Sequence, residues 1–453
     1  MTKTFPKKTA KIKQTLQSYP REFWIGFFSL TVIMLFFHFI LIDTNWGDEV
    51  KFRKLLKKEN YDIGSIVINR WSKWTSRLGV EYMMFLFCKT PQIVWKIVDC
   101  TIILTLYTIV CRYTKQYIPA MLLTASYPFV HLASAGWIAT TTNYLWPFFA
   151  MILCIHILLT LSRKFNIYLC ALYFLLLFYF MFSEIMSAVY ICILFMLFFE
   201  KKLSAKNNIM FFASLVVITF GISNHLFCPG NSIRTDREIQ KWMPEFPDLT
   251  MFSRFRICAV STLQHYTSIP NILFFVFNGL LIYCVWNTTT KKTKRIISLL
   301  PMLINIISTG YYTYFEIIKK RSVDYVEPQV IIGQGTKEYW LQIFLLILAL
   351  VYFVSSIYSI YTFFYQTSFQ KAIRYCFVFA IGMGTRFFLM FSPTMLASST
   401  RMYFLCYVAM MWISLNMLSD KKAKKLNKYL YVILIVGIIL NTAMIVMLQR
   451  KYS

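Results

Sequence analysis

Two adjacent acids, Asp48 and Glu49, are the first candidates for chemistry in this sequence. They stand about one helical turn beyond the first long apolar window, residues 23–42. Two carboxylates at the end of a membrane span can act as a general base or hold a divalent metal ion, and glycosyl transfer can use either. The alternative is that they open the next helix, because acids are favoured in a first turn, and this alternative weighs most for Glu49.

Arginines supply the second kind of candidate. Arg77 follows the acids, Arg234 follows a Pro-Gly-Asn turn, and Arg401 follows a Ser/Thr-rich turn. A guanidinium group can bind phosphate through two parallel hydrogen bonds. The alternative for Arg77 is an arginine that extends its charge from the membrane edge into water. Arg386 lies inside an apolar window, so it requires a polar interior or a partner such as Glu184.

Uncharged polar and aromatic residues could contact a sugar. Residues 135–147 combine aromatic rings with a Thr-Thr-Thr-Asn run, which suits sugar hydroxyls, although such rings also form ordinary aromatic belts at membrane surfaces. Glu184 lies in a short turn between two apolar windows, where an acid is expected to have a function, a partner or a helix-capping role. The candidate sugar or acceptor contacts are Trp137, Asn143, Tyr144, Glu184 and Asn231.

The elements that must position these residues are membrane helices. The chain has 453 residues, of which 58% are apolar and 15% are charged, and its mean hydropathy is +0.57, which is too apolar for a soluble globular protein. A span needs about 20 apolar residues. We therefore expect an all-α, polytopic membrane protein with one domain over residues 1–453 and about 13 transmembrane helices. The apolar windows lie near 23–42, 92–111, 117–135, 145–162, 165–182, 185–199, 209–224, 270–287, 296–315, 339–362, 375–392, 402–418 and 429–448.

The positions of the basic residues predict how the helices are oriented. If residues 1–22 form a cytoplasmic tail, every second connection is cytoplasmic, and each of these carries Lys or Arg, as the positive-inside rule requires. The candidate residues then share the external side. The long external loops are 43–91, with a helix lying in the membrane interface, 225–269 and 316–338. This distribution accounts for the net charge of +28 without a nucleic-acid partner.

The candidate motifs together resemble those of a known superfamily. They comprise the pair Asp48-Glu49, Arg77, a Trp…Asn-Tyr-Leu-Trp-Pro segment ending at Pro147, a Ser-Glu turn at Glu184, a Pro-Gly-Asn-x-x-Arg loop ending at Arg234, and a Ser-Pro…Arg turn ending at Arg401. Over residues 45–404 the chain resembles a bacterial family of unassigned function within the GT-C superfamily, related to Gtr-type glucosyltransferases. Relatives carry two aspartates where this chain has Asp48 and Glu49.

The GT-C resemblance implies an inverting glycosyltransferase with a polyprenyl-phosphate sugar as donor and an active site on the outer face of the cytoplasmic membrane. By that resemblance Asp48 is the base or metal-side acid, and Arg77, Arg234 and Arg401 contact the donor phosphate. An outward site also needs a sugar that has already crossed the membrane, which fits a lipid-linked donor. The expected acceptor is a glycan or a lipid, and no cofactor is indicated beyond the divalent metal that the acids could hold. The alternatives are a surface polysaccharide polymerase or ligase, and a lipid-linked sugar flippase or transporter.

Overall fold

The computed structural model describes residues 19–161, 166–200, 205–268, 272–314, 337–398, 400–420 and 426–452. Most of the expected tail at 1–22 and most of the expected loop at 316–338 lie outside the described residues. The secondary structure in the described ranges is helical, apart from one isolated bridge between Ser134 and Gly136. The all-α fold expected from composition is therefore confirmed.

Eight helical segments in the described ranges are long and apolar enough to cross a membrane. The multi-pass membrane architecture is supported, but the figure of about 13 spans is not. Three of the other apolar windows form helices of only 14, 16 and 17 residues. The window at 117–135 is divided at Pro128. The window at 296–315 belongs to a helix, Lys292–Thr313, that begins with a Lys/Arg-rich turn. The eight segments are Arg21–Leu41, Gln92–Thr114, Trp137–Leu161, Ile209–Phe227, Tyr339–Tyr365, Phe369–Phe391, Thr400–Leu418 and Tyr429–Tyr452.

The N-terminal half packs its apolar helices around one another, with α2 against α6 and α7 and with α9 against α10. Nearly every position of these helices is apolar, so their inward faces form the core and their outward faces suit lipid. The elements are α2 (Arg21–Leu35), the π-helix η1 (Phe36–Leu41), α6 (Gln92–Thr114), α7 (Tyr117–Ala125), η2 (Phe129–Ala133), α8 (Trp137–Asn143), α9 (Leu145–Leu161), α10 (Ile167–Phe180), α11 (Glu184–Phe199) and α12 (Ala205–Phe227).

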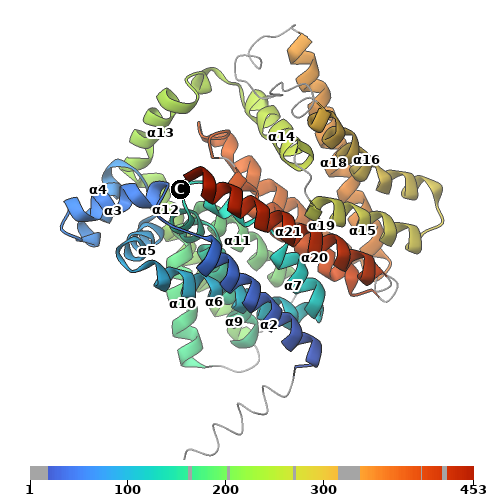
Figure 1. Ribbon diagram of the computed structural model, residues 1–453, viewed down its shortest axis with the longest axis horizontal. Helices are drawn as coiled ribbons and strands as arrows, with labels where there is room; N and C mark the ends of the chain where they lie inside the picture. Colours follow the sequence, from blue (N-terminus) through green and yellow to red (C-terminus); the bar gives the residue numbers. More distant parts are fainter. Residues whose placement is uncertain are drawn as a thin grey trace, which may run out of the picture.

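The C-terminal half forms a second group, in which α14, α16 and α19 pack on α18, and α20 packs on α15 and α19. The helix α21 crosses to the first half and lies against α7 (Figure 1). The elements are α13 (Pro229–Trp242), η3 (Phe246–Asp248), α14 (Met251–Ser268), α15 (Ile272–Thr288), α16 (Lys292–Thr313), α18 (Lys337–Tyr365), α19 (Phe369–Phe387), η5 (Phe388–Phe391), η6 (Thr400–Tyr403), α20 (Phe404–Leu418) and α21 (Asn427–Tyr452).

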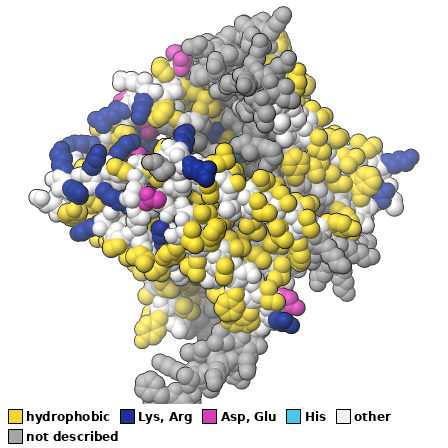
Figure 2. Space-filling view, viewed as in Figure 1, with side chains coloured by type: hydrophobic (Ala, Val, Ile, Leu, Met, Phe, Trp, Pro, Cys, Tyr) yellow, Lys and Arg dark blue, Asp and Glu magenta, His cyan; other side chains and the backbone are white. Residues whose placement is uncertain are grey.

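Residues 43–91 form a helical cap rather than one interfacial helix. Three short helices follow one another: α3 (Asp48–Lys58), α4 (Ile63–Lys73) and α5 (Leu78–Lys89). Lys and Arg gather on the surface over α3 and α4, whereas apolar side chains cover the middle of the same face (Figure 2). The last helix ends beside this cap, because the rings of Trp46 and Tyr452 stack with centroids 4.3 Å apart. The cap therefore sits at one end of the helical bundle.

Candidate functional site

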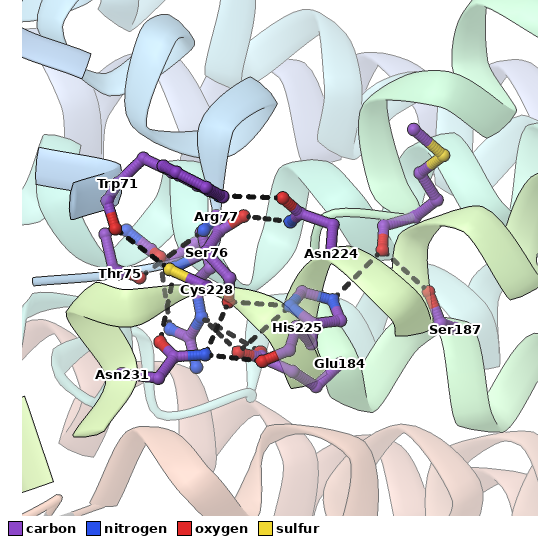
Figure 3. A network of polar contacts seen from close by, with 12 residues as sticks. Trp71, Thr75, Ser76, Arg77, Glu184, Ser187, Asn224, His225, Cys228 and Asn231 are labelled. Atoms are coloured by element: carbon purple, nitrogen blue, oxygen red, sulfur yellow. Dashed lines mark hydrogen bonds and ion pairs between the residues drawn. The ribbon is translucent and has the colours of Figure 1, made fainter. Parts of the chain in front are cut away.

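An ion pair between Arg77 and Glu184 lies at the centre of the candidate site. Arg77 precedes α5 and Glu184 begins α11, and Arg77 Nε donates to both carboxylate oxygens of Glu184, at 3.0 and 3.3 Å. Arg77 Nη1 also donates to Asn143 Oδ1 at 3.4 Å. The two charged side chains are 25% and 38% exposed, so a ligand can reach them. The structure thus brings three of the expected site residues together from three separate segments, and Figure 3 shows Arg77 beside Glu184.

The electrostatics keep this arginine charged. The negative charge of Glu184 raises the pKa of Arg77 above its already high usual value, and this effect outweighs the opposing effect of burial. Ser183 precedes α11 but makes no side-chain capping bond, so Glu184 is engaged by Arg77 rather than forming a capping pair with Ser183. The pair therefore presents a fixed cation beside a partly exposed carboxylate.

His225 extends this network toward the body of the protein. Its Nε2 lies 3.2 Å from the carbonyl oxygen of Met181, and a carbonyl can only accept, so Nε2 carries hydrogen. In the neutral ring, Nδ1 then accepts from the hydroxyl of Ser76 at 2.7 Å. The same Nδ1 lies 3.7 Å from Glu184 Oε1. These contacts give His225 a structural role and place its ring next to the ion pair.

Two asparagines hold the turn that carries Arg77. Asn231 donates to the carbonyl of His225 at 2.8 Å and accepts from the backbone N–H of Ser76 at 3.3 Å. Asn224 donates to the carbonyl of Ser76 at 2.7 Å and accepts from the indole of Trp71 at 2.9 Å (Figure 3). Asn231, expected to contact sugar or acceptor, therefore positions the turn before Arg77.

The Pro-Gly-Asn turn fits here because of its glycine. A Cβ on Gly230 would collide with the backbone of Trp71 and Trp74. Arg234 follows on α13, where its Nε donates to Glu238 at 2.8 Å and its guanidinium lies 5.5 Å from the ring of Trp74. It also interacts electrostatically with Glu184. Arg234 is therefore a neighbour of the Arg77 pair, with an acid partner of its own.

Tyr144 and Arg401 link this region to the C-terminal half. The hydroxyl of Tyr144 lies 3.1 Å from the sulfur of Met402, which follows Arg401 in η6. Tyr144 also interacts electrostatically with Arg77. Among the described residues, Arg401 Nε is buried and has no hydrogen-bond partner. Arg401, the last of the three arginines expected to bind phosphate, is therefore the sequence neighbour of Met402, whose sulfur contacts Tyr144.

Asp48 and Glu49 have very different surroundings. Asp48 Oδ1 accepts from Lys51 at 2.9 Å, and both side chains are partly exposed. Glu49 is fully buried, and its Oε1 accepts from the backbone N–H groups of Ile138 and Ala139 at 2.5 and 3.4 Å. Burial raises the pKa of Glu49 to about 8, although these N–H groups and the nearby Arg53 oppose the shift. Glu49 thus opens α3 and at the same time caps α8.

The contact between Glu49 and α8 requires a glycine at position 136. Gly136 has φ +114°, and a Cβ there would overlap the Glu49 carboxylate. Gly47, with φ +70°, similarly lies against the backbone of Ala135. The other end of α8 carries Asn143, which binds Arg77. This seven-residue helix is about 10 Å long, so it separates the acids from the Arg77 pair by roughly that distance.

The acids do not assemble a metal centre with other ligands. Within the described ranges no group of three or more His, Cys, Asp or Glu side chains is arranged to hold a metal ion. Asp48 and Glu49 also direct their bonded oxygens to different partners, Lys51 and α8. The donor set around the pair therefore does not fit a divalent ion, and none of the chemistry proposed below passes through a metal.

Two further expectations need correction. Trp137 is 1% exposed, so its ring is part of the core and offers no face to a sugar in this conformation. Arg386 does not pair with Glu184, which is already bound to Arg77. Instead, Arg386 Nη2 donates to Ser261 Oγ and to the carbonyl of Met395, both at 2.9 Å. Arg386 therefore forms hydrogen bonds to uncharged acceptors within the C-terminal half.

A second polar cluster, not singled out in the sequence, lies within the spans. Asp99 of α6 accepts from the indole of Trp146 at 2.6 Å and contacts His38 Nε2 at 2.9 Å. All three side chains are buried, and His38 lies in the π-helix η1. The sequence did contain a signal for this cluster: Asp99 is an acid within an apolar window, and an acid inside a membrane is costly unless it has a partner or a function. Asp99 is therefore, like Arg386, an ionisable residue within a membrane-spanning segment.

Comparisons with known proteins add no family to these observations. No protein-family model matches the chain, and no match is found among curated proteins or among solved structures.

Proposed function

We propose that this chain is a membrane glycosyltransferase that uses a polyprenyl-phosphate sugar as donor, inverts the anomeric carbon and modifies a glycan or lipid acceptor on the outer face of the cytoplasmic membrane. The observation that carries the proposal is the partly exposed Arg77–Glu184 pair, which sits at one end of an apolar helical bundle beside Asn143 and Arg234. A fixed guanidinium at a membrane boundary suits the phosphate of a lipid-linked donor.

The reaction assigns the two ends of α8 to two tasks. The acceptor hydroxyl attacks the anomeric carbon, and its proton passes to the carboxylate of Asp48. The bond between the anomeric carbon and the phosphate oxygen breaks, and the electron pair leaves with polyprenyl phosphate. Arg77, with Arg234 and Arg401 nearby, stabilises the charge of this leaving group.

The buried acid has a positioning role in this proposal. Glu49 holds the N-terminus of α8 while Asn143, at the C-terminus, orients Arg77. Asn231 acts in the same way by fixing the turn that contains Ser76. Asn143 and Tyr144 are partly exposed at the C-terminal end of α8 and are the proposed sugar contacts, whereas buried Trp137 supports them from the core.

A membrane preparation with a radiolabelled polyprenyl-phosphate hexose tests the proposal. We expect label to move to an acceptor while unlabelled polyprenyl phosphate accumulates, and only when the protein is present. Intact donor that changes leaflet without bond cleavage would instead identify a flippase. A product that lengthens by whole repeat units would identify a polymerase.

Sidedness has its own test. Single cysteines at Ser232, on α13, and at Thr290, between α15 and α16, are placed in a background without other cysteines; both positions are exposed. We expect an impermeant thiol reagent applied outside intact cells to label only the cysteine at position 232. Labelling only at position 290 would put the Arg77 network on the cytoplasmic side and refute an outward active site.

The buried cluster of Asp99, His38 and Trp146 favours a transporter as the second candidate. Transporters place ionisable residues within their spans, often beside irregular helix geometry, and His38 stands in a π-helix. Transport through this cluster would be abolished by Asp99→Asn, whereas bond cleavage at the Arg77 network would continue in the fraction of that variant that folds.

A further inference from the structure

A cleft of about 400 Å³ lies between α3, the turn that follows α3, and the junction of α5 with α6. It shares no lining residue with the network in Figure 3. The lining residues are Asn45, Arg53, Leu56, Lys57, Tyr61, Cys88, Lys89, Thr90, Pro91 and Gln92. The cleft therefore combines cations, amides and one aromatic ring around an apolar floor.

The cations converge from two walls. Arg53 and Lys57 are four residues apart on α3, so they project from the same face of that helix. Lys89 comes from the end of α5, on the opposite wall, with its ammonium 5.7 Å from the ring centroid of Tyr61. None of the ten lining residues is acidic. An anion in the cleft would thus meet three positive charges.

Arg53 and Lys89 form hydrogen bonds to uncharged groups. Arg53 donates to the carbonyl and hydroxyl oxygens of Thr44 at 3.2 and 3.0 Å and to Asn45 Oδ1 at 2.8 Å. Lys89 donates to the carbonyl of Tyr61 at 3.4 Å. The bonds orient both side chains without neutralising them. Arg53 in particular is held ready for an anion.

Acids close to the cleft have other cationic neighbours. Asp43 lies 3.4 Å from Gln92 and interacts electrostatically with Lys96. Asp48, at the start of α3, pairs with Lys51. Neither acid lines the cleft. Glu49 interacts electrostatically with Arg53 but does not line the cleft either. The three lining cations therefore keep the field inside the cleft positive.

The position of the cleft suggests where the ligand comes from. Gln92 begins the spanning segment Gln92–Thr114, so the cleft lies at the end of a membrane helix. Its floor is apolar, formed in part by Leu56 and Cys88, which are both buried. Lys57 and Lys89 are exposed at the mouth. A ligand with a phosphate group and an apolar part next to it would match both surfaces.

We propose that this cleft is a second anion site, which binds a phosphate group through Arg53, Lys57 and Lys89, independently of the Arg77 network. A lipid head group and a soluble phosphate compound both present the phosphate oxygens that this site would bind. The inference does not rest on the proposed glycosyl transfer.

The test measures binding to the full-length protein in a non-ionic detergent. The probes are dioctanoyl phosphatidic acid, dioctanoylglycerol, which has the same chains without phosphate, and inorganic phosphate. We expect the phosphatidic acid to bind and dioctanoylglycerol to bind at least about tenfold more weakly, because charge-assisted hydrogen bonds are lost. Competition by inorganic phosphate at similar concentrations would identify a soluble ligand, and its failure to compete would identify a lipid.

Matched variants separate the cleft from general surface charge. The double variant Lys57→Gln with Lys89→Gln removes two exposed cleft cations, and Lys54→Gln with Lys58→Gln removes two exposed cations of α3 that do not line the cleft. We expect the first pair to weaken phosphatidic acid binding about tenfold and the second pair to change it less than about twofold. Equal losses in the two pairs, or tight binding of dioctanoylglycerol, would overturn the proposal.

A further variant distinguishes phosphate binding in the cleft from glycosyl transfer at the Arg77 network. Arg77→Gln removes the arginine of the candidate active site, which lies outside the cleft. We expect this variant to bind phosphatidic acid as the unchanged protein does, even where glycosyl transfer is lost. Loss of binding in Arg77→Gln, with binding retained in the Lys57 and Lys89 variant, would assign the phosphate to the Arg77 network and refute a second site.

Discussion

Glu49 and Glu184 lie at the same end of the bundle, but they differ in burial and in the groups that they bind. Glu49 is fully buried and bonds to backbone N–H groups of α8, whereas Glu184 is 38% exposed and bonds to the guanidinium of Arg77. A carboxylate without access to solvent can hold a helix but cannot meet a substrate. The comparison therefore favours Glu184, rather than Glu49, as the glutamate beside a bound ligand, and it gives Glu49 a structural role.

The largest effect is expected where α8 meets Glu49. The substitution Gly136→Ala puts a Cβ onto the Glu49 carboxylate at a backbone conformation that alanine avoids, so we expect a loss of at least about 3 kcal/mol in unfolding free energy. The matched control is Gly310→Ala on α16, where nothing lies within 4 Å of the added atom. Denaturant unfolding in detergent measures both. Equal stability of the two variants would mean that Glu49 does not occupy the space beside Gly136.

At the other end of α8, the main effect is expected on activity. Arg77→Gln removes the guanidinium that we propose binds the donor phosphate, so we expect polyprenyl phosphate release to fall about 100-fold. The unfolding free energy should change by about 1 kcal/mol, since the ion pair is partly exposed. Arg77→Lys keeps the charge without the planar fork and should recover only part of the rate. Full activity in Arg77→Gln would remove this pair from the proposed site.

The acids and arginines show how far the sequence alone could lead. The apolar windows anticipated the helices closely, and the helix-end connections that carry Arg77, Asn143, Glu184 and Asn231 were expected on one side of the membrane. Their contacts depend on tertiary packing, which periodicity does not encode. For instance, the buried carboxyl group of Glu49 fits against α8 only because position 136, far away in the sequence, is a glycine.

Other misses have the same physical origin. Of the two surroundings expected for Arg386, the polar interior is the one found, because Glu184 is already bound to a different arginine. The expected 13 spans are not confirmed, because several apolar windows form helices of 14 to 17 residues or are divided by proline, and eight segments in the described ranges are long and apolar enough to cross a membrane. By contrast, Asp99 was detectable, since a lone acid in an apolar window is itself a signal.

The pH dependence of stability sharpens the comparison further. The folded pKa of Glu49, about 8, lies above the usual value of 4.5, so its proton is retained on folding. Its contribution to stability is then present at low pH and is lost as the pH rises from about 4.5 to about 8, by on the order of 5 kcal/mol. Glu49→Gln keeps the acceptor for α8 and cannot ionise, so its melting temperature should fall less over this range. The same pH slope in both proteins would show that Glu49 is ionised when buried.

The smallest effect on stability is expected at Asp48. Its ion pair with Lys51 is exposed, and exposed pairs contribute little, so Asp48→Asn should change the unfolding free energy by less than about 0.5 kcal/mol. Thermal unfolding in detergent measures this. A large loss of stability would assign Asp48, like Glu49, to structural support.

Release of polyprenyl phosphate by Asp48→Asn tests the central claim most directly. The matched control is Glu59→Gln, which removes an exposed acid just after the other end of α3. With both variants folded, we expect Asp48→Asn to release polyprenyl phosphate at least about 100-fold more slowly than the unchanged protein, and Glu59→Gln to stay within about twofold. Full release by Asp48→Asn would contradict its role as the base.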